Sequence, residues 1–216
     1  MQAVSSSGTS RRAVCAACGQ VAIGPVAGGR CPNLWCSRPG RPLQAVFSAG
    51  LYQGALRRAI VAYKYGGDRR WAEVFARVLL GFLERHACWF EELTVLCPVP
   101  SYAGPGARRD WSPVETFCAE LGVLSAGAWP VEALVAKLAE TPALTGKPGP
   151  ARREVMAQSR FAVPKPVAVK GSRVLLVDDV CTSGQTLLTV SCVLKAAGAS
   201  EVSALVLARA RWRGRP

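Results

Sequence analysis

Apolar residues recur at helical spacing in the first half of the chain and predict two amphipathic helices. The first has one apolar face from Tyr52 to Tyr63 and ends at Gly66–Gly67, where the pattern breaks. The second carries apolar residues three and four positions apart from Trp71 to Leu83. Both helices should bury one face and leave the other in water.

A third helix is predicted after Ser112, where three signals agree. Ser112 can cap the first turn, Pro113 suits the first helical position, and Glu115 completes a capping box. Glycine is a poor helix former. We therefore expect this helix to run to about Leu121 and to stop at Gly122.

Shorter apolar runs predict strands between these helices. Gln44–Ala49 alternates loosely, and Thr94–Val99 is a short apolar run that ends in the sequence Pro-Val-Pro. Trp129–Val135 is a further candidate strand.

The C-terminal third predicts a strand–helix–strand unit. Val174–Val177 is a continuous apolar run, which is typical of a strand buried on both faces of a parallel sheet. A helical stripe from Leu187 to Ala197 follows and is ended by Gly198, and Val202–Ala208 reads as the next strand. The fold class predicted is α/β, an open and mainly parallel sheet with helices on both faces.

Composition divides the 216 residues into three zones. Residues 1–14 are polar and small and are expected to be disordered, residues 15–42 are rich in Cys, Gly and Pro, and residues 43–216 have the α/β pattern. No apolar run is long enough to span a bilayer, and the N-terminus lacks the apolar middle of a signal peptide. We expect a cytoplasmic protein with no membrane span.

The formal net charge is +13, which favours an anionic partner such as a phosphorylated metabolite, RNA or DNA. The basic residues are 21 Arg and 6 Lys spread along the chain, and this also fits a general arginine bias of the encoding genome. Both interpretations stay open on charge alone.

Four of the nine cysteines lie close together, at Cys15, Cys18, Cys31 and Cys36. Their spacing matches a tetrahedral Zn²⁺ site filled entirely by thiolates, which would be structural because no position is left for water. An odd total with one tight cluster argues against a disulfide framework. Redox exchange and an iron–sulfur cluster are the alternatives to zinc.

The residues after the predicted strand Val174–Val177 have the chemistry of an anion site. Two carboxylates, Asp178 and Asp179, come first, and a run of small and hydroxyl residues then leads into a helix. The N-terminus of a helix offers free N–H groups and a positive dipole end to a phosphate. The carboxylates suit a ligand that also presents hydroxyl groups or a divalent cation.

The segment Val174–Thr186 resembles the phosphoribosyl-pyrophosphate motif of type I phosphoribosyltransferases. The resemblance implies an Mg²⁺-dependent site for 5-phosphoribosyl-1-pyrophosphate, with the acidic pair on the ribose hydroxyls and the loop around the 5-phosphate. Carried over residue by residue, the ligand-binding set is Asp178, Asp179, Val180, Thr182, Ser183, Gly184, Gln185 and Thr186.

The order of motifs along the chain resembles the ComF-like phosphoribosyltransferases, which are associated with competence and DNA uptake in bacteria. It comprises the four cysteines, the segment Tyr63–Asp68, the strand end Pro98–Pro100 with its basic loop, and the phosphate motif. The resemblance implies that Lys64 and Arg109 act beside Asp178 and Asp179 in catalysis, by charge stabilisation at pyrophosphate. For Lys64 the alternative is a helix-end cation that extends to solvent, and for Arg109 it is a solvated basic loop.

Two segments depart from the family pattern. The loop after Arg109 reads Asp110-Trp-Ser-Pro in place of a Gly-Phe-Asn-Gln run, and Leu144 follows Thr141–Pro142 where the family has Gln. These departures bear on acceptor recognition and on turnover.

Two other functions remain open from the sequence. One is a binding protein that keeps the phosphate loop as a ligand sensor, while arginine pairs such as Arg57–Arg58 and aromatic residues such as Trp71 and Trp111 engage single-stranded DNA or an uptake protein. The other is nucleobase salvage, for which no segment stands out as a hood over the base.

Overall fold

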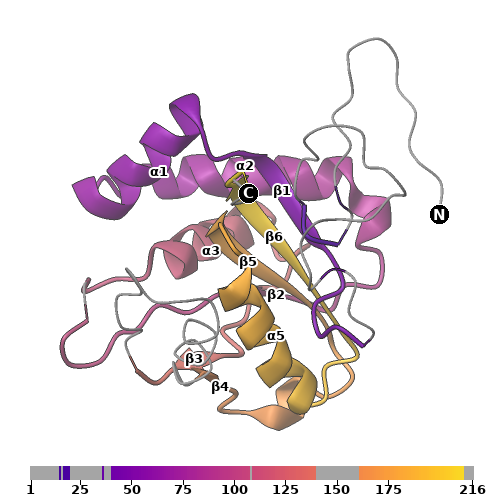
Figure 1. The fold of residues 1–216 in the computed structure, drawn as a ribbon. Coiled ribbons are helices and arrows are strands. Elements are labelled where there is room, and N and C mark those ends of the chain that lie inside the picture. The colour runs from indigo at the N-terminus through magenta and orange to yellow at the C-terminus, as the bar shows by residue number, and fades with distance from the viewer. Residues whose placement is uncertain are drawn as a thin grey trace, which may run out of the picture.

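The computed structural model describes residues 15, 17–19, 36, 40–107, 109–139 and 161–211. Within them, four parallel strands form one open sheet in the order β1-β6-β5-β2 (Figure 1). The strands are β1 (Val46–Leu51), β2 (Val95–Pro98), β5 (Arg173–Cys181) and β6 (Glu201–Arg209). The α/β prediction is confirmed.

Helices cover both faces of this sheet. On one face lie α1 (Gly54–Gly66), α2 (Trp71–Arg85) and α3 (Pro113–Leu124), whose buried residues pack against Leu175, Val177 and Leu205. On the other face lies α5 (Gln185–Ala196), which packs on the intervening strand residues Val174, Leu176 and Val206. In Figure 1 this helix crosses in front of the sheet. No helix among the described residues is both long and apolar enough to cross a membrane.

Small elements complete the described part of the chain. They are the antiparallel pair β3 (Ala136–Lys137) and β4 (Phe161–Ala162), and the 3₁₀ turns η3 (Ala87–Trp89) and η4 (Pro166–Ala168). The predicted disordered residues 1–14, the segment Thr141–Pro142 and Leu144 lie outside the described residues.

The third predicted helix is confirmed at its start and wrong at its end. Ser112 Oγ accepts the backbone N–H of Glu115 at 3.5 Å, as a cap should. The helix continues through Gly122 to Leu124, because Leu121 is buried and Leu124 packs on the same core. A single glycine costs a helix about 1 kcal/mol, which packing on both sides of it offsets.

The strand predicted at Trp129–Val135 is wrong. The structure has only an isolated bridge between Val131 and Leu96 at the outer edge of β2. Leu96 donates its N–H to the carbonyl of Pro130 at 2.8 Å, but Pro130 itself has no N–H to extend the ladder.

The strand predicted to end at Val177 extends to Cys181. Its partner β6 runs on to Arg209, so backbone pairing continues from Asp178 opposite Val206 to Cys181 opposite Arg209. Asp178 and Asp179 are therefore strand residues, with their positions fixed by the sheet, rather than the first residues of a loop.

Candidate functional site

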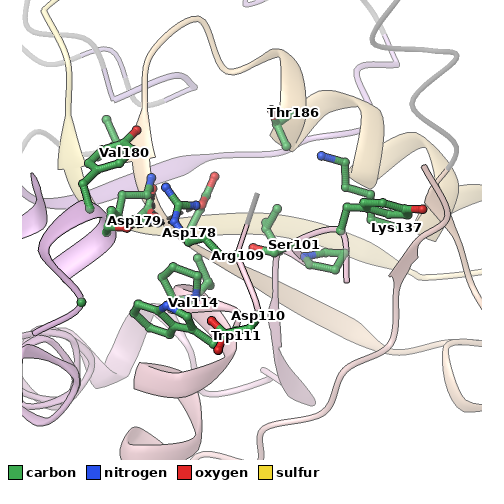
Figure 2. A pocket seen from close by; sticks show the side chains of 17 residues that line it. Ser101, Arg109, Asp110, Trp111, Val114, Lys137, Asp178, Asp179, Val180 and Thr186 are labelled. Atoms are coloured by element: carbon green, nitrogen blue, oxygen red, sulfur yellow. Dashed lines mark hydrogen bonds and ion pairs between the residues drawn. The ribbon is translucent and has the colours of Figure 1, made fainter. Parts of the chain in front are cut away.

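A pocket of about 750 Å³ opens at the carboxyl ends of β2 and β5. The chain leaves β2 toward α3 on one face and leaves β5 toward α5 on the other, so this is a point where strand connections diverge. Ligands of open α/β sheets bind in such a crevice. Figure 2 shows side chains from several elements around it, among them Ser101, Arg109, Asp110, Trp111, Val114, Lys137, Asp178, Asp179, Val180 and Thr186.

Two neighbouring carboxyl groups, those of Asp178 and Asp179, line the pocket. Asp179 is 5% exposed and Asp178 is half-buried. The N–H of Asp179 donates to Asp178 Oδ1 at 2.9 Å. Burial, and then the charge of Asp179, raise the pKa of Asp178 to about 7, against the opposing effect of Lys64. The pair therefore carries fewer than two negative charges at neutral pH.

Lys64 comes from the last turn of α1 and meets this pair. Its Nζ lies 2.6 Å from Asp179 Oδ2, and its side chain is 23% exposed. Burial alone would lower the pKa of Lys64, but Asp179, by charge and hydrogen bond, and then Asp178 raise it overall. Lys64 thus points into the site as a cation rather than out to solvent.

Arg109 is held at the same rim by contacts with the end of α1. Its Nε donates to the carbonyl of Lys64 at 2.8 Å, and its guanidinium lies 5.0 Å from the centre of the Tyr65 ring. The Nε–H of the Arg109 guanidinium is therefore engaged by the Lys64 carbonyl. The neighbouring Arg108 lies outside the described residues.

The loop before α3 and the first residue of α3 both contact α1, through an aromatic contact and a hydrogen bond. Tyr63 OH donates to the carbonyl of Pro113 at 2.7 Å, and its ring meets Trp111 edge to face at 4.9 Å. Trp111 also lies under the guanidinium of Arg69, at 5.2 Å. These contacts link the Lys64 and Arg109 sides of the pocket.

The predicted phosphate loop joins β5 to the N-terminus of α5. Gly184 adopts a left-handed conformation with φ of 79°, which glycine accepts without strain, and the helix starts at Gln185. Thr182 and Ser183 are exposed, and Ser183 Oγ accepts the N–H of Gln185 at 3.4 Å. The turn presents hydroxyls and helix N–H groups to solvent.

The structure brings half of the eight predicted ligand residues to the lining of one pocket. Val180 and Thr186 line it together with both carboxylates, Lys64 and Arg109, whereas Thr182, Ser183, Gly184 and Gln185 form the adjoining turn and are not among its lining residues.

Tyr102 and Lys137 are among the lining residues that the sequence interpretation did not assign to the site. Tyr102 follows the end of β2, and Lys137 lies in β3 on the opposite side of the pocket from Asp179 (Figure 2). The position of Tyr102 just after Pro-Val-Pro was a usable signal. Lys137 had none, because its place depends on the pairing of β3 with β4.

Three of the four predicted zinc ligands also converge. The sulfur atoms of Cys15, Cys18 and Cys36 all lie within 4.8 Å of one another. Such a thiol set fits Zn²⁺. Cys31 lies outside the described residues.

Comparison with known proteins bears on the C-terminal part. Residues 121–216 match the family model of the phosphoribosyl transferase domain. This match takes in the acidic pair, the phosphate loop and α5, but it covers less than half of the chain and excludes Lys64 and Arg109. No curated protein sequence matches the chain.

Solved structures include weak matches. One is glutamine phosphoribosylpyrophosphate amidotransferase from B. subtilis complexed with ADP and GMP, at 23% identity and a TM-score of 0.36, over 53% of this chain and 22% of that one. Another is described as the allosteric regulatory enzyme of purine biosynthesis, at 24% identity and a TM-score of 0.38, over 62% of this chain and 25% of that one. The chain thus spans a quarter or less of the length of these two structures.

Proposed function

We propose that this protein binds 5-phosphoribosyl-1-pyrophosphate, or a related ribose phosphate, and transfers its phosphoribosyl group to an acceptor. The observation that carries the proposal is the convergence of Asp178, Asp179, Lys64 and Arg109 on one pocket beside the turn at the start of α5. The family match to the segment with the acidic pair supports it from an independent direction.

Each part of such a ligand has a suitable partner. The carboxylates of Asp178 and Asp179 accept hydrogen bonds from ribose hydroxyls, and the turn Thr182–Thr186 offers hydroxyls and N–H groups to the 5-phosphate. Lys64 and Arg109 supply positive charge where a pyrophosphate would leave. We expect Val180 near the end of β5, and Gln185 and Thr186 at the start of α5, to contact the ligand as well.

Transfer would break the bond between ribose C1 and the pyrophosphate oxygen, with positive charge developing on the ring. The electron pair of that bond leaves with pyrophosphate, and the acceptor supplies a new pair to C1. Positioning and charge stabilisation by Lys64 and Arg109 would provide most of the rate, since no side chain forms a covalent bond.

The donor set at the pocket also fits Mg²⁺. Two carboxylates offer the hard oxygen ligands that Mg²⁺ prefers, and phosphate oxygens of the ligand would complete its shell. Asp178 and Asp179 would hold the ion directly or through water. When bound, Mg²⁺ neutralises charge on the pyrophosphate. Zn²⁺ at Cys15, Cys18 and Cys36, with Cys31 as fourth ligand, would have a structural role.

We further propose that the protein is of the ComF type and acts in the cytoplasm in DNA uptake. The order of the cysteine turn, Lys64 segment, Pro98–Pro100 strand end and phosphate loop supports it. We also propose that residues 15–42 form a zinc knuckle and residues 43–216 a transferase-like domain, on the basis of the same order of motifs.

Calorimetric titration tests the proposal. 5-Phosphoribosyl-1-pyrophosphate with Mg²⁺ should bind saturably to the zinc-loaded protein, and the Asp178→Asn/Asp179→Asn variant should not bind. The matched control is Asp110→Asn, which alters an exposed carboxylate at the pocket rim. No binding by well-folded wild type would refute the assignment, and an acceptor screen with pyrophosphate release as readout follows a positive result.

The alternative, a protein that binds single-stranded DNA, has less support from the described residues. Trp71 is partly buried and stacks on Phe75, so its ring packs against the core rather than being presented to a base. Oligonucleotide binding that weakens steeply with salt, with no response to the ribose phosphate, would favour this alternative.

A further inference from the structure

The largest fully buried side chain among the described residues is a charged one, Arg209, which is 1% exposed. It lies at the carboxyl end of β6, between Cys181 of β5 and Leu51 of β1. The guanidinium stays protonated in proteins, so the fold keeps a full positive charge out of water. Such burial destabilises the fold unless an anion or hydrogen bonds compensate it.

The compensation available to Arg209 is incomplete. Its Nη1 donates to the carbonyl of Thr182 at 2.8 Å and contacts Cys181 Sγ. Its Nε and Nη2 are buried and have no hydrogen-bond partner within the part of the chain that the structure describes. Burial raises the pKa of Cys181 to about 11, although Arg209 acts against this, so the sulfur is a neutral thiol. Among the residues that the structure describes, no carboxylate forms an ion pair with this guanidinium.

Its one carbonyl partner belongs to the predicted phosphate loop. Thr182 is exposed at the head of the turn that leads through Ser183 and Gly184 into α5. A guanidinium that holds the Thr182 carbonyl from behind fixes that peptide plane, and it adds positive charge next to the helix N-terminus. A phosphate dianion in front of the turn would supply the missing negative charge.

We propose that Arg209 is a positioning residue for the 5-phosphate: it anchors the Thr182 carbonyl and places a buried, uncompensated cation behind the phosphate loop. The inference rests on the proposed function, because it takes the ligand of that loop to be the 5-phosphate of a ribose. Arg209 does not touch the reacting atoms, and it acts through the loop and through its charge.

Two probes separate this role from general structural support. Ribose 5-phosphate should use the loop, whereas inorganic pyrophosphate with Mg²⁺ should use the Lys64 and Arg109 side. Arg209→Gln keeps a donor for the Thr182 carbonyl but removes the charge, and it should weaken ribose 5-phosphate at least about tenfold while pyrophosphate binding changes less than about twofold. Arg209→Lys should recover most of the loss. Arg77→Gln, at an exposed arginine of α2 away from the pocket, is the matched control and should bind both probes as wild type does.

A measurement on wild type covers the case in which Arg209→Gln does not fold. The side-chain Nε–H resonance of Arg209 should shift on addition of ribose 5-phosphate and stay in place on addition of pyrophosphate. An unmoved resonance, unchanged ribose 5-phosphate binding by Arg209→Gln, or equal loss of both probes would each overturn the inference. Failure of wild type to bind ribose 5-phosphate would instead refute the proposed function, and the role of Arg209 with it.

Discussion

At the residue scale, the site depends on how two adjacent carboxyl groups share one ammonium. Lys64 pairs with Asp179 at 2.6 Å, while Asp178 is left with a backbone hydrogen bond and a raised pKa. A carboxyl group with such a pKa is poised to exchange its proton for a cation or a hydroxyl partner. The ligand-free state therefore holds unfavourable electrostatic energy that a ligand can relieve.

Replacing Asp178 should reveal its raised pKa as a change in how stability depends on pH. Its pKa is about 7 in the folded protein, against the ordinary value of 3.8 for an aspartate, so the folded protein holds the proton more tightly. Its contribution to stability is then greatest below about pH 4 and is lost as the pH rises to about 7. Asp178→Asn should raise the free energy of unfolding by about 1–2 kcal/mol at pH 8 and by less at pH 4. Equal effects at both pH values would contradict the raised pKa.

The same pKa predicts the pH dependence of ligand binding in wild type. The ionised carboxylate is the form that accepts ribose hydroxyls and binds Mg²⁺, so affinity should increase between pH 6 and pH 8. Calorimetry in buffers of different ionisation enthalpy should detect protons released on binding at pH 6.5.

The ion pair between Lys64 and Asp179 can be tested with a double-mutant cycle. Lys64→Met leaves a buried carboxylate without its cation and should cost about 1–3 kcal/mol, less than a fully buried pair because Lys64 is 23% exposed. The Lys64→Met/Asp179→Asn double variant should regain at least about 1 kcal/mol in urea unfolding. Additive effects would mean that the two side chains do not interact in solution. Lys195→Met, at an exposed lysine, is the control.

At the element scale, local patterns predicted the helices well because an apolar stripe decides which face is buried. The predicted C-terminal ends of α3 and β5 were wrong, because they depend on packing and pairing partners that the local pattern does not show. Leu121 and Leu124 keep α3 helical past Gly122, and β6 draws β5 on to Cys181. The acidic pair was predicted from its motif, but its contact with Lys64 was not, since that contact depends on strand order and on the packing of α1.

Tyr63 connects two of these elements, and its removal should be measurable. Its hydroxyl donates to the carbonyl of Pro113 and so ties the end of α1 to the start of α3. Tyr63→Phe leaves that buried carbonyl without its donor and should lower the free energy of unfolding by about 1–2 kcal/mol. Tyr52→Phe, at a half-buried tyrosine near Arg57, should change it by less than about 0.5 kcal/mol. Similar effects of the two substitutions in urea unfolding would contradict the link.

At the scale of the whole molecule, the turn from Cys15 to Gly19, here called the cysteine turn, packs against the sheet. Cys18 is fully buried in the same core cluster as Leu43 and Val46. Gly19 has φ of 65° and lies against the β1 backbone, where an added Cβ would come 2.7 Å from the carbonyl oxygen of Val46. A metal held by this turn would therefore stabilise the edge of the sheet as well as the turn itself.

Removing the metal should accordingly lower the stability of the whole protein. Purified wild type should contain about one Zn²⁺, because the thiols of Cys15, Cys18 and Cys36 converge. Cys18→Ser should lose the zinc and melt about 5–10 °C lower, as metal binding energy is folding energy. A chelator should lower the melting temperature of wild type toward that of the variant and leave the variant unchanged.

Cys88→Ser is the matched control, since Cys88 is exposed in η3 and outside the cluster. It should keep both the zinc and the melting temperature of wild type. Iron and sulfide in place of zinc would favour the iron–sulfur alternative. A metal-free protein in which both substitutions leave the melting temperature unchanged would refute a structural metal, and the turn would then be held to β1 by the burial of Cys18 and the close fit of Gly19 alone.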